Sequence, residues 1–382
     1  MRPRLCRHPQ EARQAQPLLP SPPLPSRDAR VVPEDQLIDS HGRVLRDLRV
    51  SVTDRCNFRC LYCLPETEAA QNFYRGRWAN LPNSTPIQHS WAPRSHLLTF
   101  EEIVRFVRLA VGRGIRKIRL TGGEPLLRRE LEKLVGLLAE IPGIEDLAMT
   151  TNGSGFRSRG AALRQAGLRR ITFSLDSLDP AIFRKMTGRD ELDEVLAGIR
   201  LARELGLSPV KVNAVIIRDL NDGELERLAE FSRAEDLSFR FIEFMPLDSA
   251  RAWQKDLVVS GQEILRRLQA RFQLEPVDSE NRSETSKRWR FSDGRGEIGI
   301  IAPVSEPFCG HCNRLRLTAD GKIRTCLFSV QEHDIRDRMR SGATDAQLSD
   351  YLTQVVWQKE ARHHIGEPEF ISPPRSMSCI GG

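Results

Sequence analysis

Short runs of β-branched and apolar residues alternate with longer amphipathic stretches from about residue 45 onward. The short runs have the length of buried strands, and the longer stretches carry apolar residues at the spacing of one helix face. The clearest helix is expected at 100–111, where Thr99 and Glu102 form a capping-box pattern before an apolar stripe. The predicted strands are 48–52, 116–120, 146–150, 171–175, 210–216 and 238–244, and the other predicted helices are 127–140, 158–166, 191–205, 224–235 and 261–272.

Six successive strand–helix units predict an α/β fold with a parallel sheet and right-handed connections. Six units are too few for a closed eight-stranded barrel, so we expect an incomplete (β/α)6 barrel of the TIM type. After about residue 275 the pattern becomes turn-rich, with a last helical stretch near 345–361, which indicates a smaller C-terminal α+β domain. The expected division is an N-terminal segment at 1–44, the barrel at 45–274 and the second domain at 275–382.

Two segments depart from this pattern. Residues 1–35 are rich in proline and lack apolar periodicity, so we expect them to be disordered. Their arginine content leaves a mitochondrial transit peptide as an alternative, but transit peptides are amphipathic and poor in proline, so a cytoplasmic location is favoured. Residues 67–97 form an insertion between the first strand and its helix, and a loop of this length is usually functional or disordered.

Composition narrows the classes of partner. Hydrophobic residues make up 40% and charged residues 29% of the 382 positions, as in globular proteins. The net charge is +7, but much of it comes from the arginine-rich start, so a basic face for nucleic acid is not expected. No long apolar run is present, so no membrane-spanning helix is expected.

Six of the eight cysteines fall into two groups of three. The first group, Cys56, Cys60 and Cys63, has the spacing C-x3-C-x2-C and follows the first predicted strand. Three thiolates on one loop can bind three irons of a 4Fe–4S cluster and leave the fourth iron open. A structural zinc site normally needs four protein ligands, and no nearby His or Cys completes this set. The spacing therefore predicts an iron–sulfur cluster.

The second group is Cys309, Cys312 and Cys326. It again has three cysteines, which favours a second cluster with one open iron. His311 leaves a zinc site as an alternative, because it is a possible fourth ligand. Against that alternative, His311 lies inside the short C-x2-C loop, where reaching the same metal is strained.

Polar and glycine-rich motifs follow four more predicted strands. They are Thr121-Gly122-Gly123-Glu124-Pro125, Thr150-Thr151-Asn152-Gly153, Ser174-Leu175-Asp176-Ser177 and Met245. Each motif alone is a weak signal, since a turn, a cap or a core residue would look the same. Active sites of barrel enzymes lie at the C-terminal ends of successive strands, so we expect these motifs to meet in one site.

The first cysteine motif, with an aromatic residue before its last cysteine, resembles the signature of the radical S-adenosylmethionine (SAM) superfamily. The motif C-x2-C-N-R-L-R, with Cys326 after a further spacer, resembles the MoaA-type GTP 3′,8-cyclases. The resemblance runs from about residue 45 to the terminal Gly-Gly and includes GGEPLLRR, FSLDSLD and RFIEFMP. It does not cover residues 1–35 or the 67–97 insertion.

The resemblance implies a radical SAM lyase that carries two 4Fe–4S clusters. Its reaction would convert GTP to (8S)-3′,8-cyclo-7,8-dihydroguanosine 5′-triphosphate, the first step of molybdenum cofactor (molybdopterin) synthesis. A 5′-deoxyadenosyl radical would take hydrogen from C3′ of GTP, and the second cluster would bind the guanine. The implied partners are an external one-electron reductant and cyclic pyranopterin monophosphate synthase as the next enzyme, while a homodimer is left open.

The resemblance also implies individual contacts. A triphosphate carries about four negative charges, which suit the forked donors of arginine. SAM contacts are implied at Tyr62, Gly122, Gly123, Glu124, Ser174 and Met245. GTP contacts are implied at Arg49, Arg119, Thr150, Lys211, Arg314, Leu315 and Arg316. Catalytic roles are implied for Cys56, Cys60, Cys63, Arg49, Arg314, Arg316, Gly381 and Gly382, with both cysteine groups as the cluster ligands.

Two other functions stay open on the sequence. One is a radical SAM enzyme with an auxiliary cluster that modifies a peptide or RNA, against which the Arg-Leu-Arg stretch and the terminal Gly-Gly argue. The other is a noncatalytic zinc-binding adaptor, which would contain zinc and no iron.

Overall fold

The computed structural model describes residues 36–75, 91–247, 253–279, 281–368 and 370–381. The predicted disordered start lies outside these residues, as do the central part of the 67–97 insertion and Gly382. Among the described residues, no helix combines the length and the apolar character needed to cross a membrane.

Six parallel strands form the centre of the fold, as predicted. Each strand pairs with the next one along the chain, and each boundary lies within about one residue of its predicted position. The strands are β1 (Asp47–Ser51), β2 (Lys117–Thr121), β3 (Asp146–Thr151), β4 (Arg170–Ser174), β5 (Val210–Ile216) and β6 (Ser238–Glu243). The incomplete barrel is therefore confirmed.

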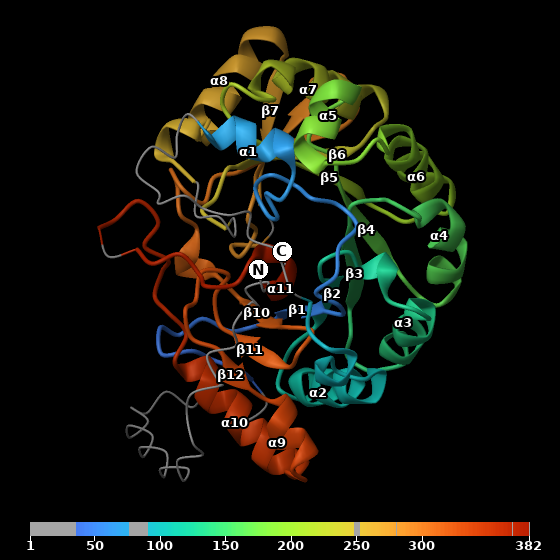
Figure 1. Cartoon of the computed structure of the whole chain (residues 1–382), viewed down its shortest axis with the longest axis vertical. Helices are drawn as coiled ribbons and strands as arrows, with labels where there is room; N and C mark the ends of the chain where they lie inside the picture. The colour runs from blue at the N-terminus through green and yellow to red at the C-terminus, as the bar shows by residue number, and fades with distance from the viewer. Residues whose placement is uncertain (1–35, 76–90, 248–252, 280, 369, 382) are drawn as a thin grey trace, which may run out of the picture.

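Helices connect the strands and cover the outside of the curved sheet (Figure 1). The predicted capping box is present, because Thr99 Oγ1 accepts from Glu102 N and the Glu102 carboxylate accepts from Thr99 N. The predicted helices are α2 (Phe100–Gly112), α3 (Leu131–Ala139), α4 (Phe156–Gln165), α6 (Leu192–Glu204), α7 (Leu225–Ala234) and α8 (Gly261–Arg271). In the barrel region, two further described helices, α1 (Glu68–Arg75) and α5 (Pro180–Thr187), were not predicted, and α1 lies within the 67–97 insertion.

The C-terminal region extends the sheet at both edges. Beside β6 it adds β9 (Glu297–Ile301) in parallel, then β8 (Lys287–Phe291) and β7 (Leu274–Val277). Beside β1 it adds β10 (Arg314–Leu317) in parallel, then β11 (Lys322–Arg324) and β12 (His333–Asp334). The domain boundary at 274/275 stays a prediction, since both regions share one sheet.

The remaining elements are short, apart from one helix. The predicted C-terminal helical stretch is α10 (Asp345–Trp357), which starts with a second capping box at Thr344. The others are α9 (Arg336–Arg340), α11 (Met377–Ile380) and the 3-10 turns η1 (Arg94–His96), η2 (Pro125–Leu127), η3 (Asp222–Glu224), η4 (Lys255–Leu257) and η5 (Cys309–His311).

The hydrophobic core lies between the sheet and the outer helices. Successive side chains of a strand point to opposite faces, so alternate residues enter this core. On β6, Phe239 and Phe241 belong to the core, while Arg240 between them lines the interior of the barrel. The same alternation places Leu48 in the core and Arg49 in the interior. The inside of the barrel is therefore lined by many polar and charged groups.

Candidate active site

A cavity of about 530 Å³ occupies the interior of the barrel. A smaller pocket of about 110 Å³ lies at the C-terminal ends of β1 to β4. The two spaces adjoin, because five residues line both. These residues are Tyr62, Thr150, Ser174, Asp176 and Met377.

The first cysteine group lines the smaller pocket. Cys56, Cys60 and Cys63 lie on the loop that follows β1, and all three border this one space. Burial raises the pKa of the Cys56 thiol to about 11 and also raises the pKa of Cys60. Thiolates in this position need a cationic centre to hold them in the charged form. The three residues and the space beside them therefore fit a 4Fe–4S cluster with one open iron.

Two glycines fix the cysteine loop against the end of β2. An added Cβ would lie 2.6 Å from Thr53 O at Gly122 and 2.2 Å from Arg55 O at Gly123. The amides of Gly123 and Glu124 donate to these same carbonyls, at 2.8 and 2.7 Å. The close approach that the glycines allow is thus to the backbone of the cysteine loop. Both glycines also line the smaller pocket.

Glu124 links the ends of β2 and β3. Its carboxylate accepts from Leu126 N at 2.9 Å, Thr151 Oγ1 at 2.8 Å and Asn152 N at 2.7 Å. Burial raises the pKa of Glu124 to about 7. Asn152 in turn donates to Asn57 Oδ1 at 2.9 Å and lies with its Nδ2 3.9 Å from Cys56 Sγ. Glu124 therefore orients the surroundings of the cluster. Asn152 belongs to a motif expected in the site, but it was not among the predicted contact residues.

Tyr62 and Asp176 connect the smaller pocket to the larger cavity. The Tyr62 hydroxyl donates to Asp176 Oδ2 at 2.7 Å, and Val215 N donates to Asp176 Oδ1 at 2.8 Å. Burial raises the pKa of Asp176 to about 6. Asp176 was not among the predicted site residues, although its place in the strand-end motif FSLDSLD was a signal for it. Met245 lines only the larger cavity.

The second cysteine group lines the larger cavity, at the other end of the barrel. Cys312 precedes β10, whose first residue, Arg314, pairs with Asp47 at the start of β1. Cys326 follows β11, which runs antiparallel to β10 and so ends on the same side. Cys309 lies in η5, also before β10. The five residues of β1, a span of about 17 Å, therefore separate the levels of the two cysteine groups.

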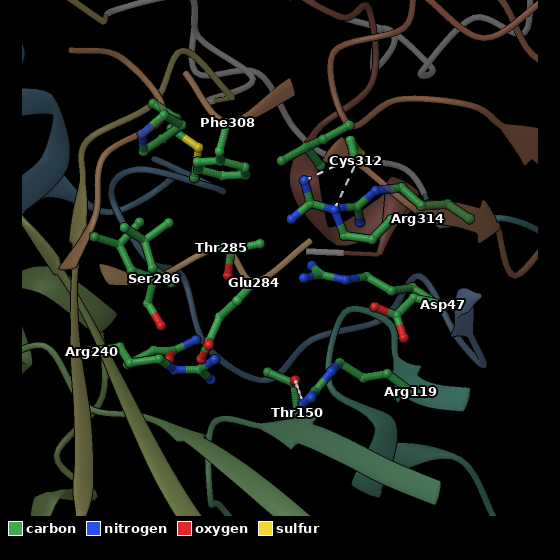
Figure 2. A pocket seen from close by; sticks show the side chains of 18 of the residues that line it. Asp47, Arg119, Thr150, Arg240, Glu284, Thr285, Ser286, Phe308, Cys312 and Arg314 are labelled. Carbon is green, nitrogen blue, oxygen red and sulfur yellow. Dashed lines mark hydrogen bonds between the residues drawn. The ribbon is translucent and has the colours of Figure 1, made fainter. Parts of the chain in front are cut away.

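The thiol of Cys312 lies against the guanidinium group of Arg314. Arg314 Nε and Nη2 lie 3.4 and 3.2 Å from Cys312 Sγ, and the guanidinium stacks over the Phe308 ring (Figure 2). Burial opposes ionisation of Cys312, but Arg314 and Lys359 lower its pKa to about 6. This environment favours the thiolate that an iron–sulfur cluster requires.

The structure does not support a zinc site at either cysteine group. His311 is exposed and does not line the cavity. Within the described ranges, no three side chains of His, Cys, Asp or Glu converge on a position for a single metal ion. Cluster ligands each bind a different iron, so thiols that are spread around a larger space fit a cluster better than a single ion.

Three arginines form a row across neighbouring strands. Arg316 on β10 pairs with Arg49 on β1, which pairs with Arg119 on β2. Burial lowers the pKa of Arg49 and of Arg316, and the nearby guanidinium groups lower both further. Like charges in directly opposed strand positions are destabilising. Among the ion pairs of the described residues, none includes these three arginines, so the row favours an anionic ligand.

Further basic side chains line the opposite wall. Burial and Arg240 lower the pKa of Lys211 on β5 to about 8. Arg240 Nη2 donates to Thr172 Oγ1 at 3.3 Å, and Arg119 Nη1 donates to the same hydroxyl at 3.1 Å. Figure 2 shows Glu284, from the β7–β8 connection, pointing toward Arg240. Arg240 and Glu284 were not among the predicted site residues.

Leu315 does not line the cavity. It alternates with Arg314 and Arg316 on β10, so its side chain points to the opposite face, where it is fully buried in the hydrophobic core. The Leu315 side chain therefore does not face the cavity, and the GTP contact implied for this stretch stays a prediction for its backbone. Each of the other predicted SAM and GTP contact residues lines one or both of the two spaces.

The C-terminal tail enters the barrel. Helix α11 lies within the ring of strands (Figure 1), and Met377 lines both pockets. The Gly381 carbonyl accepts a hydrogen bond from Arg316 Nη1. Gly381 has φ +74°, and an added Cβ would lie 2.8 Å from Thr121 Oγ1. The tail is thus docked against the arginine row and the end of β2.

Comparison with known proteins relates both halves of the chain to described families. The Radical SAM superfamily model matches residues 50–232, and the Molybdenum Cofactor Synthesis C model matches residues 237–365. Streptococcus suis SuiB bound to S-adenosylmethionine has a similar fold, with a TM-score of 0.53 and 14% identity over 81% of this chain and 68% of that one.

Curated relatives are similar over nearly the whole length. A GTP 3′,8-cyclase from Rhodopirellula baltica is 47% identical over 91% of this chain and 92% of its own. One from Acidothermus cellulolyticus is 46% identical over 85% of this chain and 87% of its own. Since both halves of the chain and both cysteine groups fall within these matches, the chain belongs to the GTP 3′,8-cyclase family of the radical SAM superfamily.

Proposed function

We propose that this chain binds GTP inside the barrel, between its two cysteine groups, and cyclises it to (8S)-3′,8-cyclo-7,8-dihydroguanosine 5′-triphosphate. As a member of its family it is a radical SAM lyase of molybdenum cofactor synthesis, which uses SAM and 4Fe–4S clusters. One observation carries the assignment of the site. The row Arg316, Arg49 and Arg119 lies in a cavity that has one cysteine group at one end and adjoins the pocket of the other.

The smaller pocket is proposed as the site of SAM and the first cluster. Cys56, Cys60 and Cys63 would hold this cluster, and Tyr62, Gly122, Gly123 and Ser174 border the space beside it. When bound, the first cluster and SAM supply a 5′-deoxyadenosyl radical that removes hydrogen from C3′ of GTP. Glu124 keeps the cysteine loop and the β3 loop together, and Met245 would contact SAM from the larger cavity.

The larger cavity is proposed as the GTP site. Cys309, Cys312 and Cys326 would hold the second cluster at its far end, where one open iron is available to the guanine. Arg314 offsets the charge of the Cys312 thiolate. The triphosphate would lie among Arg49, Arg119, Lys211, Arg240 and Arg316, with Thr150 beside Arg119. Fixed guanidinium groups inside a barrel bind phosphate oxygens without further reorganisation.

The tail is proposed to complete the GTP site. Arg316 holds the Gly381 carbonyl, and Gly381 lies against Thr121 at the end of β2. Gly381 has no side chain, so it fits into the narrow place between Arg316 and the end of β2. The tail would help position GTP and would exclude water from the radical reaction.

Two partners are proposed from family membership alone. An external one-electron reductant would supply electrons to the first cluster. Cyclic pyranopterin monophosphate synthase would take up the product.

Two triple variants separate the two cysteine groups. Anaerobic reconstitution of the unaltered chain should give about eight irons. Replacing Cys56, Cys60 and Cys63 by Ala should remove about half of this iron and abolish reductive SAM cleavage. Replacing Cys309, Cys312 and Cys326 should leave SAM cleavage detectable but stop GTP turnover. The assignment fails if the first variant still cleaves SAM or the second still makes the cyclic nucleotide.

A further inference from the structure

One short segment, 359–361, joins the backbone around all three cysteines of the second group. Lys359 Nζ donates to Arg314 O at 3.1 Å and also to Thr325 O, next to Cys326. Thr325 Oγ1 donates to Glu360 Oε2 at 2.7 Å. The carbonyls of Glu360 and Ala361 accept from Arg43. Lys359 within the segment and Arg43, which binds its carbonyls, are therefore two cations that each reach the cysteine-bearing backbone.

Arg43 contacts the first of these cysteines directly. Its Nη1 donates to Cys309 O at 2.8 Å and to Ala361 O at 2.9 Å, while Nη2 donates to Glu360 O at 2.6 Å. Its Nε donates to Asp39 Oδ2 at 2.6 Å. The planar fork of arginine can hold three carbonyls and one carboxylate in fixed directions, which lysine cannot do.

A tight turn presents Arg43 to the cysteine loop. Asp39 Oδ1 accepts from the amides of His41 and Arg43, both at 2.9 Å, and Gly42 supplies the positive φ of the turn. Arg43 is 8% exposed and Asp39 is 1% exposed. This buried arrangement lies ahead of β1 and outside the GTP and SAM spaces, so neither substrate accounts for it.

Lys359 carries a charge that its neighbours do not balance. It is 3% exposed, and its two hydrogen-bond acceptors are carbonyls. In the part of the chain that the structure describes, no ion pair includes Lys359. A buried ammonium without a counter-charge is costly. The thiolates of Cys312 and Cys326, beside the segments that Lys359 holds, would supply that counter-charge.

We propose that Arg43 and Lys359 are positioning residues of the second cluster: Arg43 fixes Cys309, and Lys359 fixes the segments of Cys312 and Cys326 and raises the reduction potential of the cluster. This inference rests on the proposed function, because it takes the second group as cluster ligands. Hydrogen bonds and charges around a cluster set its potential, and a buried cation favours the more negative, reduced state.

The test uses the full-length chain with Cys56, Cys60 and Cys63 replaced by Ala, so that only the second cluster is observed. Iron content and the midpoint potential are measured for Lys359→Met, Lys359→Arg and the control Lys287→Met, a surface lysine paired with Glu306. Lys359→Met should lower the midpoint by at least about 59 mV, a tenfold change for one electron. Lys359→Arg should restore most of the shift, and Lys287→Met should leave the midpoint unchanged.

Arg43→Lys tests the positioning role separately, because it keeps the charge and loses the fork. We expect an unchanged midpoint, an altered electron paramagnetic resonance signal and at least fivefold faster loss of iron to a chelator. A purely structural role would lower the melting temperature of the apoprotein without changing potential or signal. If Lys359→Met does not fold, Arg43→Lys still decides the positioning claim.

The outcomes that overturn the inference differ from those that overturn the proposed function. A cluster that keeps its midpoint in Lys359→Met, or its signal and iron in Arg43→Lys, contradicts the corresponding part of the inference. A cysteine-variant background that binds no iron contradicts the proposed function itself, because then the second group holds no cluster.

Discussion

Arg119 shows how a single side chain can serve binding at a cost to folding. It is half-buried in the barrel, lies directly beside Arg49, and makes hydrogen bonds to the hydroxyls of Thr150 and Thr172. Two neutral hydroxyls do not balance this guanidinium, and desolvation together with repulsion from Arg170 lowers its pKa, although Asp146 and Asp47 act in the opposite direction. The residue therefore gains its main electrostatic partner when an anion binds.

We predict that Arg119→Ala weakens GTP binding by about 1.5–3 kcal/mol, the contribution of a hydrogen bond to a charged group. SAM affinity should not change, and thermal stability should stay equal or rise because a like-charge neighbour is removed. Equilibrium binding of each ligand measures both effects. Arg290→Ala is the matched control, since Arg290 is exposed on β8 and does not line the cavity. Equal losses for GTP and SAM would instead indicate misfolding.

Lys211 makes GTP binding depend on pH. Burial and Arg240 lower its pKa to about 8 in the free protein, and a bound triphosphate would raise it again. Above pH 8 the free lysine is mostly neutral, so binding must take up a proton and should weaken as the pH rises toward 9. Calorimetry in buffers of different ionisation enthalpy should detect this proton uptake near pH 8.5. Lys211→Met should bind GTP more weakly and lack the uptake; an unchanged uptake would place the proton elsewhere.

The sequence predicted the residues of this site that belong to local motifs. It did not predict the contacts between residues that are far apart in the chain. Cysteine spacing is a local property, so both cysteine groups could be predicted. The side-chain direction of Leu315 could also have been predicted, because strand residues alternate between faces. Asp176 and Asn152 belong to strand-end motifs that the sequence displays. Their contacts with Tyr62 and Cys56 join segments that are distant in the sequence, so these contacts could not be predicted.

The loop after β2 illustrates how an element end builds the site. Gly122 and Gly123 pass so close to residues 53–55 that a side chain at either position would strike a carbonyl oxygen. The same loop places Glu124 where it joins β2 to β3. The position of the first cysteine group therefore depends on a segment that contains none of its thiols.

Gly123→Ala should consequently displace the cysteine loop. Its added methyl group would lie 2.2 Å from Arg55 O, a contact that backbone movement alone can relieve. We expect loss of the first-cluster iron and of SAM cleavage, with the iron of the second cluster retained. Gly136→Ala in α3 is the control, because an added Cβ there meets nothing within 4 Å. Normal SAM cleavage in Gly123→Ala would show that the loop tolerates the movement.

The C-terminal tail is the second element with a separable role. Deleting Gly381 and Gly382 removes the backbone acceptor of Arg316 but little buried apolar surface. Iron content, melting temperature and SAM cleavage should stay nearly unchanged, while formation of the cyclic nucleotide falls at least tenfold. A bulky tag after Gly382 should act in the same direction. Product formation at the unaltered rate would mean that the docked tail has no part in the reaction.

Elements with strong apolar periodicity were predictable, and short polar ones were not. β5 and β6 alternate buried and partly exposed residues along their length, whereas β12 has two polar residues that become a strand only through pairing with β11. Helix α5 was missed although Asp179 and Pro180 are a typical helix start, because its apolar stripe spans only eight residues. The formation of a short polar strand such as β12 therefore depends on pairing in the folded molecule, which the local sequence pattern does not show.

The fold places the two cysteine groups at opposite ends of the barrel, with the proposed substrate cavity between them. The parallel order of β1 to β6 could be predicted from strand–helix alternation, but the pairing of β10 with β1 could not, because it joins segments far apart in the chain. That pairing aligns Arg316 with Arg49 and sets Cys312 at the start of the barrel. The first cysteine group then lies at the other end of β1, so a molecule in the cavity can contact both ends.

The central claim is that a radical formed at the first cysteine group reaches C3′ of a GTP held from the second. Anaerobic incubation with SAM, a reductant and GTP deuterated at C3′, followed by mass analysis of both products, tests it most directly. We predict 5′-deoxyadenosine that carries one deuterium and a cyclic nucleotide that has lost it, with neither product formed when a peptide or RNA replaces GTP. Deuterium that remains in the nucleotide, or 5′-deoxyadenosine release that depends on peptide or RNA instead, would contradict the account.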